Sequence, residues 1–141
     1  MGRIAAIDFG LARLGLAISD ENQIIALPFV LLKAGKDFSA TAHLIAKELA
    51  RYTHIERIVL GLPLLLSGKD SAMTAQVRAF GIILEQVLGI PVSLWDERLT
   101  SAQVEKFLKS ANVNRKKRSQ VSDVLAAATI LQSFLDAGRD Y

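Results

Sequence analysis

The chain has 141 residues, of which 51% are hydrophobic and none is cysteine. This size suits a single globular domain, 1–141, with a core of its own. The lack of cysteine excludes disulfide frameworks and thiolate metal sites, and no apolar run approaches the roughly 20 residues of a membrane helix. The sequence enters a strand pattern without the charged-then-apolar layout of a secretory signal. We therefore expect a cytoplasmic protein without membrane contacts.

The net charge of +3 is unevenly distributed along the chain. Six basic residues and no acidic one lie within residues 106–118. The rest of the chain contains the other 11 of the 17 basic residues and all 14 acidic residues. Such a cluster forms either an ordinary solvated face or a contact with a polyanion, and its density in a short segment favours the polyanion. The six residues are Lys106, Lys109, Arg115, Lys116, Lys117 and Arg118.

The first predicted strand covers residues 3–9 and ends in an acid. Its apolar residues fall on both faces, which predicts a strand covered from both sides at the middle of a sheet. Asp8 lies at the end of this run, beside Gly10. Burying an ionised carboxylate there is costly unless a bound cation compensates the charge. Alternatively, Asp8 caps a turn by accepting backbone N–H bonds.

Two further apolar runs follow, over residues 14–18 and 24–32, with short connections between them. Short connections predict that these strands and the first form an antiparallel meander. Pro28 lies inside the third run and predicts an edge strand, because proline cannot donate to a sheet ladder.

The rest of the chain alternates helical and strand patterns. The expected elements are, in order, a helix over 38–52, a strand over 55–62, a helix over 72–88, a strand over 91–95, a helix capped by Thr100, and a final helix from Ser119 to about Ala137. The polar and basic segment 112–118 is expected to connect the last two helices.

This pattern predicts an α/β fold with a five-stranded mixed sheet, three strands antiparallel and two parallel, and helices on both faces. The first strand lies at the centre, and the fourth joins it in parallel. Ligands of such sheets bind beyond the carboxyl ends of the parallel strands. Asp8 ends one such strand, and the pair Asp96-Glu97 ends another.

A third acid belongs to the final helix. Asp123 precedes Ala127, Ile130, Leu131 and Phe134 at helical spacing, so it shares the apolar stripe expected to face the sheet. A charge on that stripe is not needed for packing. Asp123 either caps the helix, a role that Ser119 already fits, or is carried toward the acids of the sheet edge.

Acids that gather without histidine or cysteine favour Mg²⁺ or Mn²⁺ over zinc. Two such ions can clamp an in-line attack on phosphorus. The basic segment directly precedes Asp123, so a polyanion held there would have its backbone delivered to the acids. Together these features predict a metal-dependent phosphodiester hydrolase.

The sequence contains four motifs spread over nearly the whole chain: Asp8-Phe9-Gly10 with Arg13 and Gly15, Gly61-Leu62-Pro63 with Gly68, Asp96-Glu97-Arg98-Leu99-Thr100, and Asp123 with Ala126-Ala127. Together these motifs resemble the YqgF/RuvX family of RNase H-like proteins. The resemblance implies a cytoplasmic nuclease that matures the 5′ end of pre-16S ribosomal RNA, or a related Holliday-junction resolvase acting on branched DNA.

By this resemblance, Asp8, Glu97 and Asp123 are the catalytic and metal-binding acids. Strand alternation alone leaves Asp96 and Glu97 open, because adjacent residues face opposite ways, and the choice of Glu97 rests on the family. The expected nucleic-acid contacts are Arg13, Arg98, Arg115, Lys116, Lys117 and Arg118.

Two other classes compete with the nuclease. An ATP-binding module of the actin or hexokinase type also places an Asp-x-Gly hairpin at phosphate, but it needs two such domains around the nucleotide. A non-catalytic assembly factor would bind nucleic acid and metal without turnover.

Overall fold

The computed structural model describes residues 2–97 and 115–138, without the side chains of residues 115–123. The strands of this part form one five-stranded sheet. They are β1 (Arg3–Asp8), β2 (Arg13–Ser19), β3 (Ala26–Lys33), β4 (Ile55–Leu62) and β5 (Val92–Asp96). The described helices are α1 (Phe38–Leu49), α2 (Ala72–Leu88) and α4 (Arg115–Ala137).

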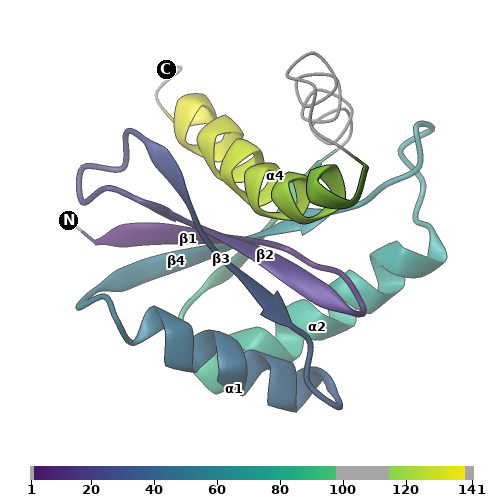
Figure 1. The fold of residues 1–141 in the computed structure, drawn as a ribbon, viewed down its shortest axis with the longest axis horizontal. Helices are drawn as coiled ribbons and strands as arrows, with labels where there is room; N and C mark the ends of the chain where they lie inside the picture. Colours follow the sequence, from purple (N-terminus) through teal and green to yellow (C-terminus); the bar gives the residue numbers. More distant parts are fainter. Residues whose placement is uncertain (1, 98–114, 139–141) are drawn as a thin grey trace.

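The strands lie in the order β3-β2-β1-β4-β5 (Figure 1). β2 is antiparallel to both β1 and β3, whereas β4 is parallel to both β1 and β5. The predicted mixed sheet with a central first strand is therefore confirmed. β3 lies at an edge of the sheet, as Pro28 predicted.

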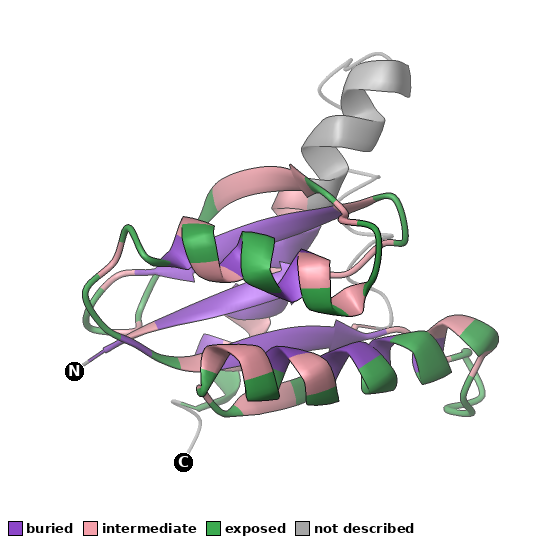
Figure 2. Ribbon diagram, turned by 90° about the horizontal axis from the view of Figure 1, so that it is seen from below, coloured by how far each residue is buried: buried purple, intermediate pink, exposed green. Residues whose placement is uncertain are grey.

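Helices α1 and α2 cover one face of the sheet and α4 covers the other (Figure 1). In β1, Ala5 and Ile7 belong to the core on the α1/α2 face, and Ile4 and Ala6 belong to the core on the α4 face. Figure 2 looks onto the α1/α2 face and shows buried strands behind helices whose outward sides are exposed. The central strand is thus covered from both sides, as its sequence predicted.

The clearest stop signals in the sequence set the element boundaries. β4 and α2 begin and end where the sequence predicts, and Gly89 closes α2 with a left-handed φ of 67°. β3 begins at Ala26, later than predicted, because the Asp20 carboxylate accepts the N–H groups of Ile24 and Ile25 at 2.7 and 2.9 Å. These bonds hold the two residues in a turn before the strand.

The prediction for the start of the last helix is wrong. α4 begins at Arg115, before Ser119, so the basic residues 115–118 form its first turn instead of a connecting segment. Lysine and arginine are good helix formers, and here their propensity outweighs the capping signal of Ser119. The predicted helix capped by Thr100 lies outside the described residues. No helix in the described part is long and apolar enough to span a membrane.

Candidate active site

Asp8 and Glu97 lie at the same edge of the sheet, on either side of β4. Asp8 is the last residue of β1, and Glu97 directly follows β5. Because β4 is parallel to both strands, all three end at one edge. The register of β1 and β4 places Asp8 beside Gly61, one residue beyond the pair of Ile7 with Leu60. One strand, β4, therefore separates the strands that carry the two acids, and the axes of β1 and β5 are roughly 10 Å apart.

Both acids also belong to the face that α4 covers. Successive side chains of a strand point to opposite faces. Ala6 packs in the α4 core, so Asp8, two residues later, lies on the same face. Trp95 packs against that core as well, so Glu97 follows it there, while Asp96 lies on the opposite face. The structure thus places Glu97, and not Asp96, on the same face of the sheet as Asp8, which the sequence pattern alone did not decide.

Gly61 makes room for the Glu97 carboxyl group. A Cβ atom at residue 61 would collide with Oε2 of Glu97 and with the Ile130 side chain of α4. The Glu97 N–H donates to the Leu62 carbonyl oxygen at 3.2 Å, which extends the pairing of β4 and β5 by one step. The carboxyl group therefore lies against β4, next to α4, and is partly buried there. A glycine within a buried strand can mark such a close approach, and that signal was available in the sequence.

The surroundings of Glu97 oppose its ionisation. Burial raises the pKa of Glu97 from 4.5 to about 7, and the neighbouring charge of Asp96 adds to the shift. A low-dielectric environment disfavours the charged form of a carboxyl group, whereas a nearby cation favours it. Near neutral pH the group is consequently balanced between its two forms, and a bound cation would hold it ionised.

Asp123 lies on α4, the helix that covers this site. Its backbone is one helical turn before Ala127, which is fully buried against the sheet, but its side chain is outside the described part. Among the described side chains, no three carboxylate, imidazole or thiol groups lie close enough to hold a metal ion. The predicted trio of Asp8, Glu97 and Asp123 therefore stays a prediction.

Trp95 fixes the end of β5 to α4. Its indole Nε1–H donates to the Ser133 hydroxyl at 3.2 Å, and its ring meets Phe134 edge-on with centroids 5.3 Å apart. Trp95, partly buried against the core of the α4 face, thus supports Glu97 two residues later. The role of Ser133 was not foreseen, because a serine at this position of the final helix gives no sequence signal.

The predicted basic contacts fall partly within the described residues. Arg13 begins β2, which is antiparallel to β1, so it lies at the same edge as Asp8. The backbones of residues 115–118 form the first turn of α4, and their side chains lie outside the described part, as does Arg98. Asp8 and Glu97 thus lie with Arg13 at one edge of the sheet, on which α4 packs with residues 115–118 in its first turn.

A protein-family model described as "RuvX: Holliday junction resolvase" matches residues 2–137. A protein of Protochlamydia amoebophila named "Putative pre-16S rRNA nuclease" is 42% identical over 140 residues, covering 96% of this chain and 93% of that protein. A protein of the same name from Koribacter versatilis is 41% identical over 136 residues, covering 96% of this chain and 87% of the relative.

Two solved resolvase structures share the fold at low sequence identity. The RuvC of T. thermophilus in complex with Holliday junction substrate aligns with a TM-score of 0.57 and 16% identity, covering 99% of this chain and 97% of that chain. The resolvase of Fowlpox virus with Holliday junction DNA aligns at 0.56 and 13%, covering 96% and 97%. The RNase H-like fold class predicted from the sequence is confirmed.

Proposed function

This chain belongs to the RuvX family, and we propose that it is a metal-dependent nuclease that hydrolyses phosphodiester bonds at the 5′ end of pre-16S ribosomal RNA in the cytoplasm. The names of the relatives from Protochlamydia amoebophila and Koribacter versatilis support the RNA substrate. One structural observation carries the proposal. The Glu97 carboxyl group, with its raised pKa, lies on the same face and at the same edge as Asp8.

The donors at this edge suit a hard divalent cation. Asp8 and Glu97 offer only carboxylate oxygens, which Mg²⁺ and Mn²⁺ prefer, and Asp123 would complete the set. Such an ion, when bound, would polarise the scissile phosphate and activate a water molecule. Glu97 would neutralise part of the ion's charge while Gly61 and Ile130 exclude solvent from one side of its carboxyl group.

The first turn of α4 would hold the polyanion. Four consecutive basic residues begin this helix, and the positive end of the helix dipole adds to their charge. Contacts of this kind bind phosphate and fix orientation without reading sequence. Arg13 and Arg98 would add phosphate contacts next to the acids. The backbone of the nucleic acid would thereby be led from Arg115–Arg118 to the sheet edge.

A second candidate uses the same residues on branched DNA. The description of the family model names a Holliday junction resolvase, which favours this substrate. A junction resolvase cuts two strands related by symmetry, so it needs two sites and acts as a dimer. Cleavage of a four-way junction by a dimer, with no cleavage of precursor RNA, would favour this candidate.

The decisive experiment incubates the purified protein with pre-16S RNA and with a four-way DNA junction, with and without Mn²⁺. We expect metal-dependent cleavage of the RNA and a loss of about 10³-fold in Asp8→Asn, since metal binding supplies several kcal/mol to the transition state. Nucleic-acid affinity should change little, because the phosphate contacts remain.

Asp96→Asn is the matched control, because Asp96 neighbours Glu97 but lies on the other face. We expect Glu97→Gln to lose most of the cleavage activity and Asp96→Asn to retain most of it. Full cleavage by Asp8→Asn would exclude Asp8 as a metal ligand. Binding without cleavage under any condition would favour a non-catalytic assembly factor, and tight ATP binding without nucleic-acid affinity would favour the ATP-binding module.

A further inference from the structure

The connection between β4 and α2 forms a small hairpin over residues 64–70, here called the β4–α2 hairpin. Leu64 and Asp70 pair as an isolated antiparallel bridge. Within the hairpin, the Leu65 N–H donates to the Lys69 carbonyl at 2.9 Å, and the Gly68 N–H donates to the Leu65 carbonyl at 2.8 Å. Gly68 has a φ of 86°, the left-handed conformation that ends a three-residue hairpin loop. The loop therefore has a defined conformation.

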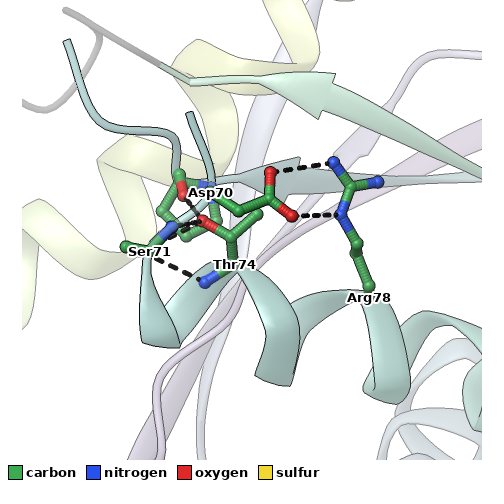
Figure 3. A network of polar contacts seen from close by, with 5 residues as sticks. Asp70, Ser71, Thr74 and Arg78 are labelled. Atoms are coloured by element: carbon green, nitrogen blue, oxygen red, sulfur yellow. Dashed lines mark hydrogen bonds and ion pairs between the residues drawn. The ribbon is translucent and has the colours of Figure 1, made fainter. Parts of the chain in front are cut away.

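Both ends of the hairpin are anchored to the start of α2 (Figure 3). At one end, the buried Thr74 hydroxyl donates to the Pro63 carbonyl oxygen and accepts the Ser71 N–H at 2.9 Å. At the other end, Asp70 accepts two hydrogen bonds from the Arg78 guanidinium, at 3.1 and 3.2 Å. The hairpin is thus fixed to a long helix at both ends and does not need to be ordered when a ligand binds.

The hairpin leaves the sheet beside the candidate active site. It begins at the carboxyl end of β4, two residues after Leu62, whose carbonyl oxygen accepts the Glu97 N–H at 3.2 Å. Figure 1 shows the connection reaching outward at the end of the molecule where α4 begins. A nucleic acid that runs from the start of α4 across Asp8 and Glu97 would therefore meet this hairpin.

The tip of the hairpin is apolar. Leu66 is 83% exposed and Leu65 is 49% exposed, and the hairpin bonds of Leu65 use only its backbone atoms, so they do not require an apolar side chain. Lys69 is the charged residue next to the tip. Two leucines fall short of the roughly 1,000 Å² that a specific protein interface needs. The tip instead has the size and chemistry of a side chain that inserts between bases, beside a lysine that can contact phosphate.

We propose that the β4–α2 hairpin separates bases next to the scissile phosphate, with Leu66 inserted into the base stack and Lys69 on the adjoining backbone. This inference rests on the proposed nuclease function and adds a specificity-determining residue to it. Insertion is costly where bases are stacked in a continuous duplex and cheap where they are already unpaired. The hairpin would thus favour cleavage at a single-stranded end or a branch point over cleavage inside a duplex.

Fluorescence of 2-aminopurine tests this inference without cleavage. The full chain is mixed, in EDTA, with an RNA that joins a duplex to a single strand and carries the probe at successive positions across the junction. Wild type should raise the fluorescence at one position, because the base there loses its stacking. Leu66→Ala should lose most of that increase, while affinity falls by no more than about threefold, since phosphate contacts supply most of the binding. Leu66→Met should restore the signal.

Leu27→Ala is the matched control. Leu27 is also exposed, at 54%, but it pairs with Ile18 toward the amino-terminal end of β1, at the edge opposite Asp8. The control should behave as wild type. An unchanged increase in Leu66→Ala, with RNA binding and Mn²⁺-dependent cleavage intact, would overturn this inference and leave the proposed function standing. A wild type that binds no nucleic acid would overturn the proposed function and this inference together.

Discussion

The two faces of the sheet are built from side chains of different size. On the α1/α2 face, large residues fill the core, and Phe80 contacts Phe9 and Phe38 at centroid distances of 4.7 and 5.5 Å. On the α4 face, the central positions are small, with Ala6 and Ala17 fully buried. Small residues let α4 approach the sheet closely. One face therefore supplies most of the packing, and the other leaves room for the acids.

The largest effect expected from this division is on stability. Phe80→Ala should lower the free energy of unfolding by about 3–5 kcal/mol, because it empties a fully buried aromatic site. The matched substitution is Phe134→Ala on the α4 face, where the half-buried ring supports Trp95. It should cost less stability.

Denaturant unfolding measures the stability of the two variants, and the cleavage rate per folded molecule measures their activity. We expect Phe80→Ala to retain its cleavage rate once folded, and Phe134→Ala to lose rate because the end of β5 is less well held. Equal losses of cleavage rate in the two variants would show that the α4 face is no more important for cleavage than the α1/α2 face.

The next effect compares two glycines, one on each side of the sheet. Gly61→Ala would push a methyl group against Glu97 and Ile130, and overpacking of this kind costs about 1–3 kcal/mol. A Cβ atom at Gly81 of α2 would lie 3.3 Å from Leu60, so a small shift would suffice. Alanine is also favoured over glycine within a helix by up to about 1 kcal/mol.

Thermal unfolding and Mn²⁺-dependent cleavage should therefore separate the pair. Gly61→Ala is expected to lose stability and most of its activity, because the Glu97 carboxyl group is displaced. Gly81→Ala should keep its activity and be at least as stable as wild type. An active Gly61→Ala variant would mean that the position of Glu97 does not matter for cleavage.

The sequence predicts elements well where local signals are strong. Pro63 follows the last residue of β4 and Gly89 follows the last residue of α2, and the predicted bounds of both elements agree with the structure. The start of α4 was misplaced because a capping serine competed with four good helix formers. Local signals thus identify the edge of the sheet at which Asp8 lies, but they do not decide between two plausible helix starts.

The environment of Glu97 was not predictable in the same way. Its face depends on the pairing of Gly61 with Trp95, which joins segments far apart in the chain. Its raised pKa depends on β4 and α4 closing over it, and no local pattern reports that. The position of the Asp123 side chain, outside the described part, stays a prediction.

A smaller effect concerns the pH dependence of stability. Folding raises the pKa of Glu97 from 4.5 to about 7, so between these values the folded state binds more protons than the unfolded state. The free energy of unfolding then falls as pH rises through this window. Glu97→Gln does not titrate, so its free energy of unfolding does not fall in this way. The free energy of unfolding of the variant minus that of wild type should therefore rise by roughly 1–3 kcal/mol between about pH 4.5 and pH 8.

Chemical denaturation of both proteins across this pH range measures the difference. Added Mn²⁺ should narrow the difference above neutral pH by stabilising wild type, because a bound cation favours the ionised carboxylate. It should stabilise Glu97→Gln less. A constant difference between the two proteins at all pH values would place Glu97 in a solvated environment and remove the reason for a cation there.

The smallest effect expected concerns the helix that covers the acids. Lys116→Ala with Lys117→Ala should weaken RNA binding for all sequences alike, because these residues would contact phosphate and not bases. For single-stranded RNA, two lost contacts reduce the slope of log affinity against log salt by about 1.4. The matched control is Lys47→Ala with Arg51→Ala, since Lys47 lies in the last turn of α1, on the other face of the sheet, and Arg51 follows just after that helix. Titrations at several salt concentrations measure both slopes. If the two double variants shift the slope equally, the affinity comes from net charge, and the first turn of α4 does not guide RNA to the acids.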